Sequence, residues 1–125
     1  MSAVFVVIAI IAGLWSAAKY MVVYNAVVDT LPPELQGGTT SRFAVPVYVL
    51  MSSTPLPLQG EYIKSGIGGC MMFLSLSLAL FAAHQPILGC LCLCITAMSL
   101  FKGAESWKTY RDNCERAGTR PFEAV

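Results

Sequence analysis

The sequence predicts an all-α membrane protein with three transmembrane helices. Hydrophobic residues make up 56% of the 125-residue chain and charged residues only 12%, against about 45–50% and about 25% in ordinary soluble domains. The apolar residues are gathered into long segments, and the basic residues fall on one side of those segments. A single membrane domain over residues 1–125 accounts for these observations, since a soluble chain of this size needs more polar surface.

The first apolar segment, about residues 4–23, is long enough to cross a bilayer. Twenty helical residues at about 1.5 Å each match a hydrocarbon core of roughly 30 Å. A cleaved secretory signal is the alternative, but such signals begin with a basic region, and no Lys or Arg precedes Lys19. We expect Lys19 to reach the headgroups, with Tyr20 and Tyr24 at the same interface.

Two further apolar segments, about residues 65–84 and 87–103, form a predicted hairpin. The sequence "HQP" at 84–86 favours a tight turn, because the residue before a proline is disfavoured in a helix. The tail, residues 104–125, continues as a helix that we expect to end at Gly118.

The loop between the first two spans, residues 29–63, holds five of the seven prolines. Helix is expected to resume near Pro55, because proline is favoured at the first helical position. Within the loop, "FAVPVYVLM" is too short to span and contains Pro46, so we expect an extended segment at the interface or against a partner. Its candidate interaction residues are Phe43, Val45, Val47, Tyr48 and Val49.

Basic residues gather on one side of the three predicted spans. The loop and the tail share that side, and the N-terminus and the 84–86 turn lie on the other. All eight Lys and Arg fall at or beyond the loop side: Lys19, Arg42, Lys64, Lys102, Lys108, Arg111, Arg116 and Arg120. Because basic residues near spans are retained inside, we expect a cytoplasmic loop and tail (matrix or stromal in an organelle) and an outside N-terminus.

Three cysteines alternate in "CLCLC", residues 90–94. Successive helical residues turn by about 100°, so Cys90 and Cys94 share a face and Cys92 points nearly opposite. Three sulfurs from one helix therefore do not converge on one ion, and the sole histidine, His84, lies in the turn. We expect these cysteines to pack as small apolar residues, with a redox or acylation role as the alternative. No metal site and no cofactor is predicted.

Small residues recur at helical spacing on each predicted span, which favours close helix packing where lipid gives no hydrophobic drive. The sequence does not decide whether the contact is internal or between chains. The residues are Gly68, Ser75, Ala79 and Ala82 on the second span, Gly89, Cys92, Thr96, Ser99 and Gly103 on the third, and Ala9, Gly13, Ser16 and Ala17 on the first.

The segments "AAKY…NAVVDTLPPEL" and "EYIKSGIGGC" give the chain an outline similar to the universal stress protein B family. Those are small inner-membrane proteins with an outside N-terminus and a basic residue before an aromatic one at the cytoplasmic end of the first span. The resemblance covers about the first 85 residues. It implies a small bacterial inner-membrane protein and assigns no functional residue.

Function is predicted mainly by exclusion. No Asp or Glu lies in the predicted spans, where a proton-coupled transporter usually has a carboxylate, and no phosphate-binding glycine loop or catalytic pattern appears. A net charge of +1 does not indicate a nucleic-acid partner. We therefore expect no enzyme but an accessory, assembly or stabilising subunit of a larger respiratory or photosynthetic membrane complex, in contact with lipids. A self-associating stress or envelope protein and a small oligomeric transporter or channel are the alternatives.

Overall fold

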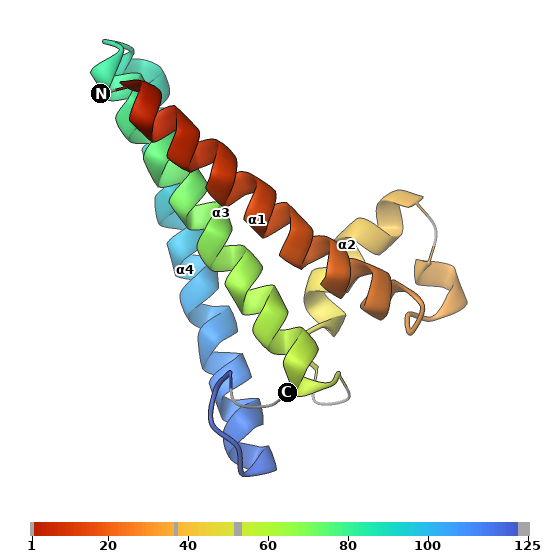
Figure 1. The fold of residues 1–125 in the computed structure, drawn as a ribbon. Coiled ribbons are helices and arrows are strands. Elements are labelled where there is room, and N and C mark those ends of the chain that lie inside the picture. The colour runs from red at the N-terminus through yellow and green to blue at the C-terminus, as the bar shows by residue number, and fades with distance from the viewer. Residues whose placement is uncertain (1, 37, 52–53, 123–125) are drawn as a thin grey trace.

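The computed structural model describes residues 2–36, 38–51 and 54–122, and it is helical (Figure 1). Three long helices, each apolar enough to cross a membrane, form its main body. Their bounds are Ser2–Val28 for α1, Leu56–Ala82 for α3 and Pro86–Ala117 for α4. Length and composition of these helices fit an integral membrane protein, as the sequence predicts.

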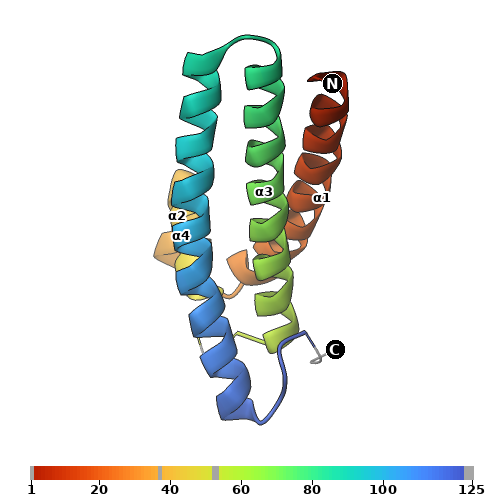
Figure 2. The same ribbon diagram turned by 90° about the vertical axis from the view of Figure 1, so that its left-hand side faces the viewer.

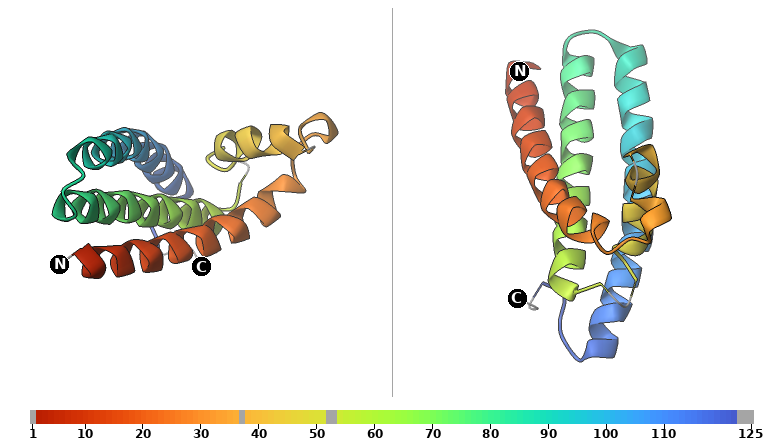
Figure 3. Two further views of the ribbon diagram at one scale, coloured as in Figure 1. Left: turned by 90° about the horizontal axis from the view of Figure 1, so that it is seen from above. Right: turned by 90° about the vertical axis from the view of Figure 1, so that its right-hand side faces the viewer.

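The three long helices stand in a row with α3 in the middle (Figures 2 and 3). Helix α3 packs along α1 on one side and along α4 on the other, and no packing joins α1 to α4 within the described residues. The N-terminal end of α1 and the α3–α4 turn lie at one end of the molecule, and the chain that follows α1 lies towards the other (Figure 1). This row leaves most side chains of the three helices uncovered by the protein itself.

The helix ends follow the predicted stop signals. Helix α1 ends at Val28, before the two prolines, and α4 ends before Gly118, whose φ of 73° is the left-handed conformation that glycine favours. Between α3 and α4, His84 has a φ of 59°, which reverses the chain before Pro86. Helix α3 starts at Leu56 with Pro55 before it, so the predicted resumption of helix near Pro55 is correct.

The connection between α1 and α3, predicted as a long proline-rich loop, is partly helical. It contains a short 3₁₀ helix, η1 (Pro33–Leu35), and an α-helix, α2 (Gly38–Tyr48). Helix α2 packs beside the C-terminal half of α1 (Figure 1). Its inner contact is a cluster of fully buried side chains: Val23, Val27, Leu31, Val45 and Val49.

The prediction of an extended segment at residues 43–51 was wrong. Buried residues recur there four apart, at Ser41, Val45 and Val49, which is the helical repeat. Almost every residue of the segment is apolar, so its pattern fits a strand and a helix equally well. The helical form is the one that packs Val45 and Val49 against Val23 and Val27 of α1. Pro46 lies inside α2 and lacks the N–H for an i→i−4 bond, and the helix ends two residues later, at Tyr48.

Lys19 forms an ion pair that the sequence did not predict. Its ammonium forms an ion pair with the Glu61 carboxylate of α3 at 2.8 Å, and Lys64 lies 3.1 Å from the other oxygen of the same carboxylate. This pairing was not predicted, because the second span was expected to begin at about residue 65, after Glu61. In the structure α3 runs unbroken from Leu56. Glu61 therefore ties α1 to α3 at the end of α1 that carries the charges.

Candidate functional site

The small-residue face of α3 is an internal contact with α1. A Cβ built on Gly68 would lie 2.8 Å from the Trp15 ring and 2.9 Å from the Ser16 Cβ. The Ser16 hydroxyl donates a hydrogen bond of 2.6 Å to the Ser65 carbonyl. Of the predicted first-span face, Ala9 is buried and Gly13 lies against Met72, while Ala17 is exposed.

The other side of α3 meets α4 through a second set of small residues. The Ser77 hydroxyl donates to the Gly89 carbonyl at 2.9 Å, and Gly89 lies against the Phe81 ring. Thr96 is also buried and donates to the carbonyl of Cys92 within α4. Buried Ser75 and Ala79 complete the packed faces of α3. These residues act inside the fold rather than between chains.

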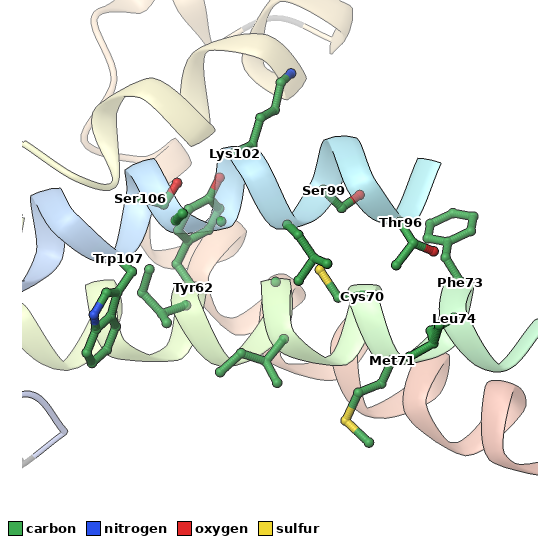
Figure 4. A pocket seen from close by; sticks show the side chains of 17 residues that line it. Tyr62, Cys70, Met71, Phe73, Leu74, Thr96, Ser99, Lys102, Ser106 and Trp107 are labelled. Carbon is green, nitrogen blue, oxygen red and sulfur yellow. The ribbon is translucent and has the colours of Figure 1, made fainter. Parts of the chain in front are cut away.

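Beyond Thr96 the two helices leave a groove between them, with a volume of about 730 Å³. Half-buried Ser99 and exposed Gly103 line this groove. The predicted small-residue face of α4 is therefore packed at Gly89 and Thr96 and open at Ser99 and Gly103. Figure 4 shows Phe73 and Thr96 at one end of this α3/α4 groove and Tyr62 and Trp107 at the other. Sequence spacing indicated the small residues but not that the helices separate there.

Helix α2 divides the five predicted loop contacts between two surfaces. Val45 and Val49 are fully buried against α1 and are unavailable to a partner. Phe43 is 75% exposed and Val47 is 61% exposed, and they lie four residues apart on the outer side of the helix, which we call the α2 outer face. Tyr48 is half-buried at the edge of the internal cluster.

The three alternating cysteines are arranged as the helical spacing predicts. Cys90 and Cys94 are exposed, and Cys92 is half-buried. Within the described ranges, no three His, Cys, Asp or Glu side chains lie close enough together to hold a metal ion. Cys114 is buried beside Tyr110 in a small cluster far along α4.

A polar cluster that sequence reasoning did not find joins the ends of α3 and α4. Gln59 is fully buried. Its amide nitrogen donates to the carbonyls of Met51 and Thr54 at 3.2 and 2.9 Å, and its amide oxygen accepts from Asn113 at 2.9 Å. Asn113 also donates to the Leu50 carbonyl at 2.9 Å. The cluster holds the chain between α2 and α3 against α4.

No family model, curated protein or solved structure matches the chain. The geometry itself offers two apolar surfaces open to the surroundings, the α3/α4 groove and the α2 outer face. Both are suited to binding apolar groups, because most of the side chains on them are apolar.

Proposed function

We propose that this protein is a non-catalytic accessory, assembly or stabilising subunit of a larger membrane complex, in a bacterial inner membrane. The observation that carries this proposal is the α2 outer face. Phe43 and Val47 are apolar, exposed and held on a helix whose inner side is fully packed. Large exposed apolar residues on a rigid element mark a contact with a protein or a membrane.

The position of α2 supports a protein partner. The helix packs on Val23 and Val27, near the end of α1 that also carries Lys19. A neighbouring membrane protein can therefore meet α2 and the uncovered side of α1 together. The row of three helices leaves α1 and α4 each with a free side, which suits a small subunit at the edge of an assembly.

The proposal is tested by replacing Val47 with Asp and, as a matched control, with Leu. A buried unpaired carboxylate costs a few kcal/mol, so Val47→Asp should lower the amount of partner that co-purifies in mild detergent by more than about tenfold. Val47→Leu should retain it. Membrane insertion should be unchanged in both, because Val47 has no role in the internal cluster. If both variants recover the same partner in equal amounts, the α2 outer face does not dock a partner.

Two other functions give different results in the same purification. A self-associating stress or envelope protein would appear alone, in multiples of its own mass. An oligomeric transporter or channel would pass or bind solute when pure. The α2 outer face favours the accessory subunit because a partner-facing helix outside the bundle is not needed to build a pore.

The proposed orientation has the N-terminus outside and the α1–α3 connection and C-terminal tail in the cytoplasm. It is supported by the basic residues, which gather at one end of the row of helices. In a chain without its native cysteines, single cysteines at Ala3 and Gln85 should react with an impermeant thiol reagent added to intact cells. Cysteines at Glu34 and Thr119 should react only after lysis, and the opposite pattern would reverse the orientation.

A further inference from the structure

Residues 119–122 follow the left-handed turn at Gly118 and lead back from the end of α4 towards the start of α3 (Figure 2). We call this segment the strap. Within it, Phe122 is bound to two residues of α4. The Phe122 N–H donates a hydrogen bond of 2.9 Å to the Tyr110 hydroxyl, and the Phe122 ring is stacked on Trp107, with the ring centroids 5.7 Å apart. The strap is therefore fastened to the helix that it follows.

Two residues of α3, one helical turn apart, contact the strap as well. The Lys64 ammonium lies 5.6 Å from the centre of the Phe122 ring, which is within the range of a cation–π contact. Gly60 is buried, and a Cβ built on it would lie 3.5 Å from the Phe122 ring and 3.1 Å from the Tyr110 hydroxyl oxygen. Glycine at this position lets the strap and Tyr110 approach α3 closely. Phe122 therefore joins α3 to α4.

Phe122 keeps a backbone conformation that phenylalanine rarely adopts. Its φ is 65°, in the left-handed region where the Cβ crowds the neighbouring carbonyl. A residue stays in such a conformation only when the contacts around it outweigh the strain. Because the Phe122 side chain is still 42% exposed, those contacts are few. The strap is therefore held by a small number of contacts against its own backbone strain, which is typical of a segment that opens more readily than the helices beside it.

Trp107 also lines the α3/α4 groove, at the end where Tyr62 lies (Figure 4). The indole that Phe122 contacts is thus part of the groove wall. We propose that the strap controls this end of the groove. While Phe122 is bound, the Trp107 ring is fixed in the wall; when Phe122 leaves, the ring is free to turn and the Tyr62 end of the groove opens. The Gln59–Asn113 bond still joins the two helices, so the change is local. The strap does not rest on the proposed docking through α2.

Tryptophan fluorescence tests the strap, because the chain has two tryptophans and Trp107 is the sole reporter in the Trp15→Phe protein. In mild detergent, Phe122→Ala should free the indole. The anisotropy of Trp107 should fall, and its quenching by acrylamide should rise by about twofold or more, the effect of losing one stacked aromatic contact. Phe43→Ala makes the same change at an exposed phenylalanine of α2 and should alter neither signal. Because Phe122 lies outside the helices, circular dichroism should show unchanged helix content.

A bimane label on a cysteine at Gly66 measures the groove itself, because tryptophan quenches bimane at short range and Gly66 lies on the α3 wall. A Cβ there meets nothing within 4 Å, so the label has room. In a Trp15→Phe chain without its native cysteines, Trp107 should quench the label while the strap is bound. Phe122→Ala should relieve that quenching, and Trp107→Phe gives the unquenched reference.

Two further variants distinguish the bound strap from the mere presence of a side chain at Phe122. Phe122→Tyr keeps an aromatic ring and should keep Trp107 protected from acrylamide. Gly60→Leu leaves Phe122 unchanged but places a side chain where the strap lies against α3. It should expose Trp107 as Phe122→Ala does.

Three results would overturn the proposal. If Phe122→Ala leaves Trp107 as protected from acrylamide as before, the indole is held without the strap. If Phe122→Ala exposes Trp107 but the bimane at Gly66 stays quenched, the strap does not control the groove. If Phe122→Tyr exposes Trp107 as fully as Phe122→Ala, the ring contacts do not hold the strap in place.

Discussion

Replacing Gly68 with Ala should separate α1 from α3 and lower the free energy of unfolding, whereas the same change at Gly66 should not. The new methyl group at Gly68 would lie 2.9 Å from the Ser16 Cβ. That carbon is fixed by the α1 backbone, and its hydroxyl is bound to the Ser65 carbonyl. Trp15 can turn aside, but Ser16 cannot, so the helices must move apart. Overpacking of this kind costs about 1–3 kcal/mol.

Gly66 is the matched control because it lies in the same helix, two residues earlier. A Cβ there meets nothing within 4 Å, and alanine stabilises a helix over glycine by about 0.8–1 kcal/mol. Gly66→Ala should therefore be neutral or stabilising. Both are measured by denaturant titration in mild detergent, with circular dichroism as the signal. If Gly68→Ala is as stable as Gly66→Ala, the close approach of α1 and α3 is wrong.

The sequence was sufficient for the long helices, since their apolar length and the punctuating prolines and Gly118 are local signals. Each long helix starts or ends close to such a residue. The small-residue faces were also predictable, because Gly68 and Gly89 lie at helical spacing from other small residues. Their assignment to internal contacts needed the packing of the three helices.

The rest depends on contacts between residues far apart in the chain. The contact with Val23 and Val27 of α1 determines whether residues 43–51 form a strand or a helix. The local sequence pattern does not show this contact. The Lys19–Glu61 pair joins residues 42 positions apart. The α3/α4 groove depends on how two whole helices pack along their length, and no single residue in the sequence marks it.

The buried pair of Gln59 and Asn113 should be the most costly polar contact to break. Asn113→Leu leaves the Leu50 carbonyl and the Gln59 amide oxygen without their donor. Gln59→Leu leaves the Thr54 carbonyl without its side-chain donor and removes one of the two donors to the Met51 carbonyl, which also accepts from the Thr54 N–H. A buried polar group left unpaired costs about 1–3 kcal/mol, so each single change should lower the free energy of unfolding by about 2–4 kcal/mol.

The double variant gives the sharper result, because the amide–amide bond can be lost only once. Gln59→Leu with Asn113→Leu should destabilise by less than the sum of the two single changes, and the difference measures the coupling. Thr109→Val is the control, since its hydroxyl bonds only within α4 on an exposed side and its loss should cost less than about 0.5 kcal/mol. Proteolysis should also cut the chain between α2 and α3 faster in the Gln59 and Asn113 variants, because these amides hold that segment to α4. Strict additivity of the two single changes, with unchanged proteolysis, would mean that the amides do not form the bond that closes this end of the fold.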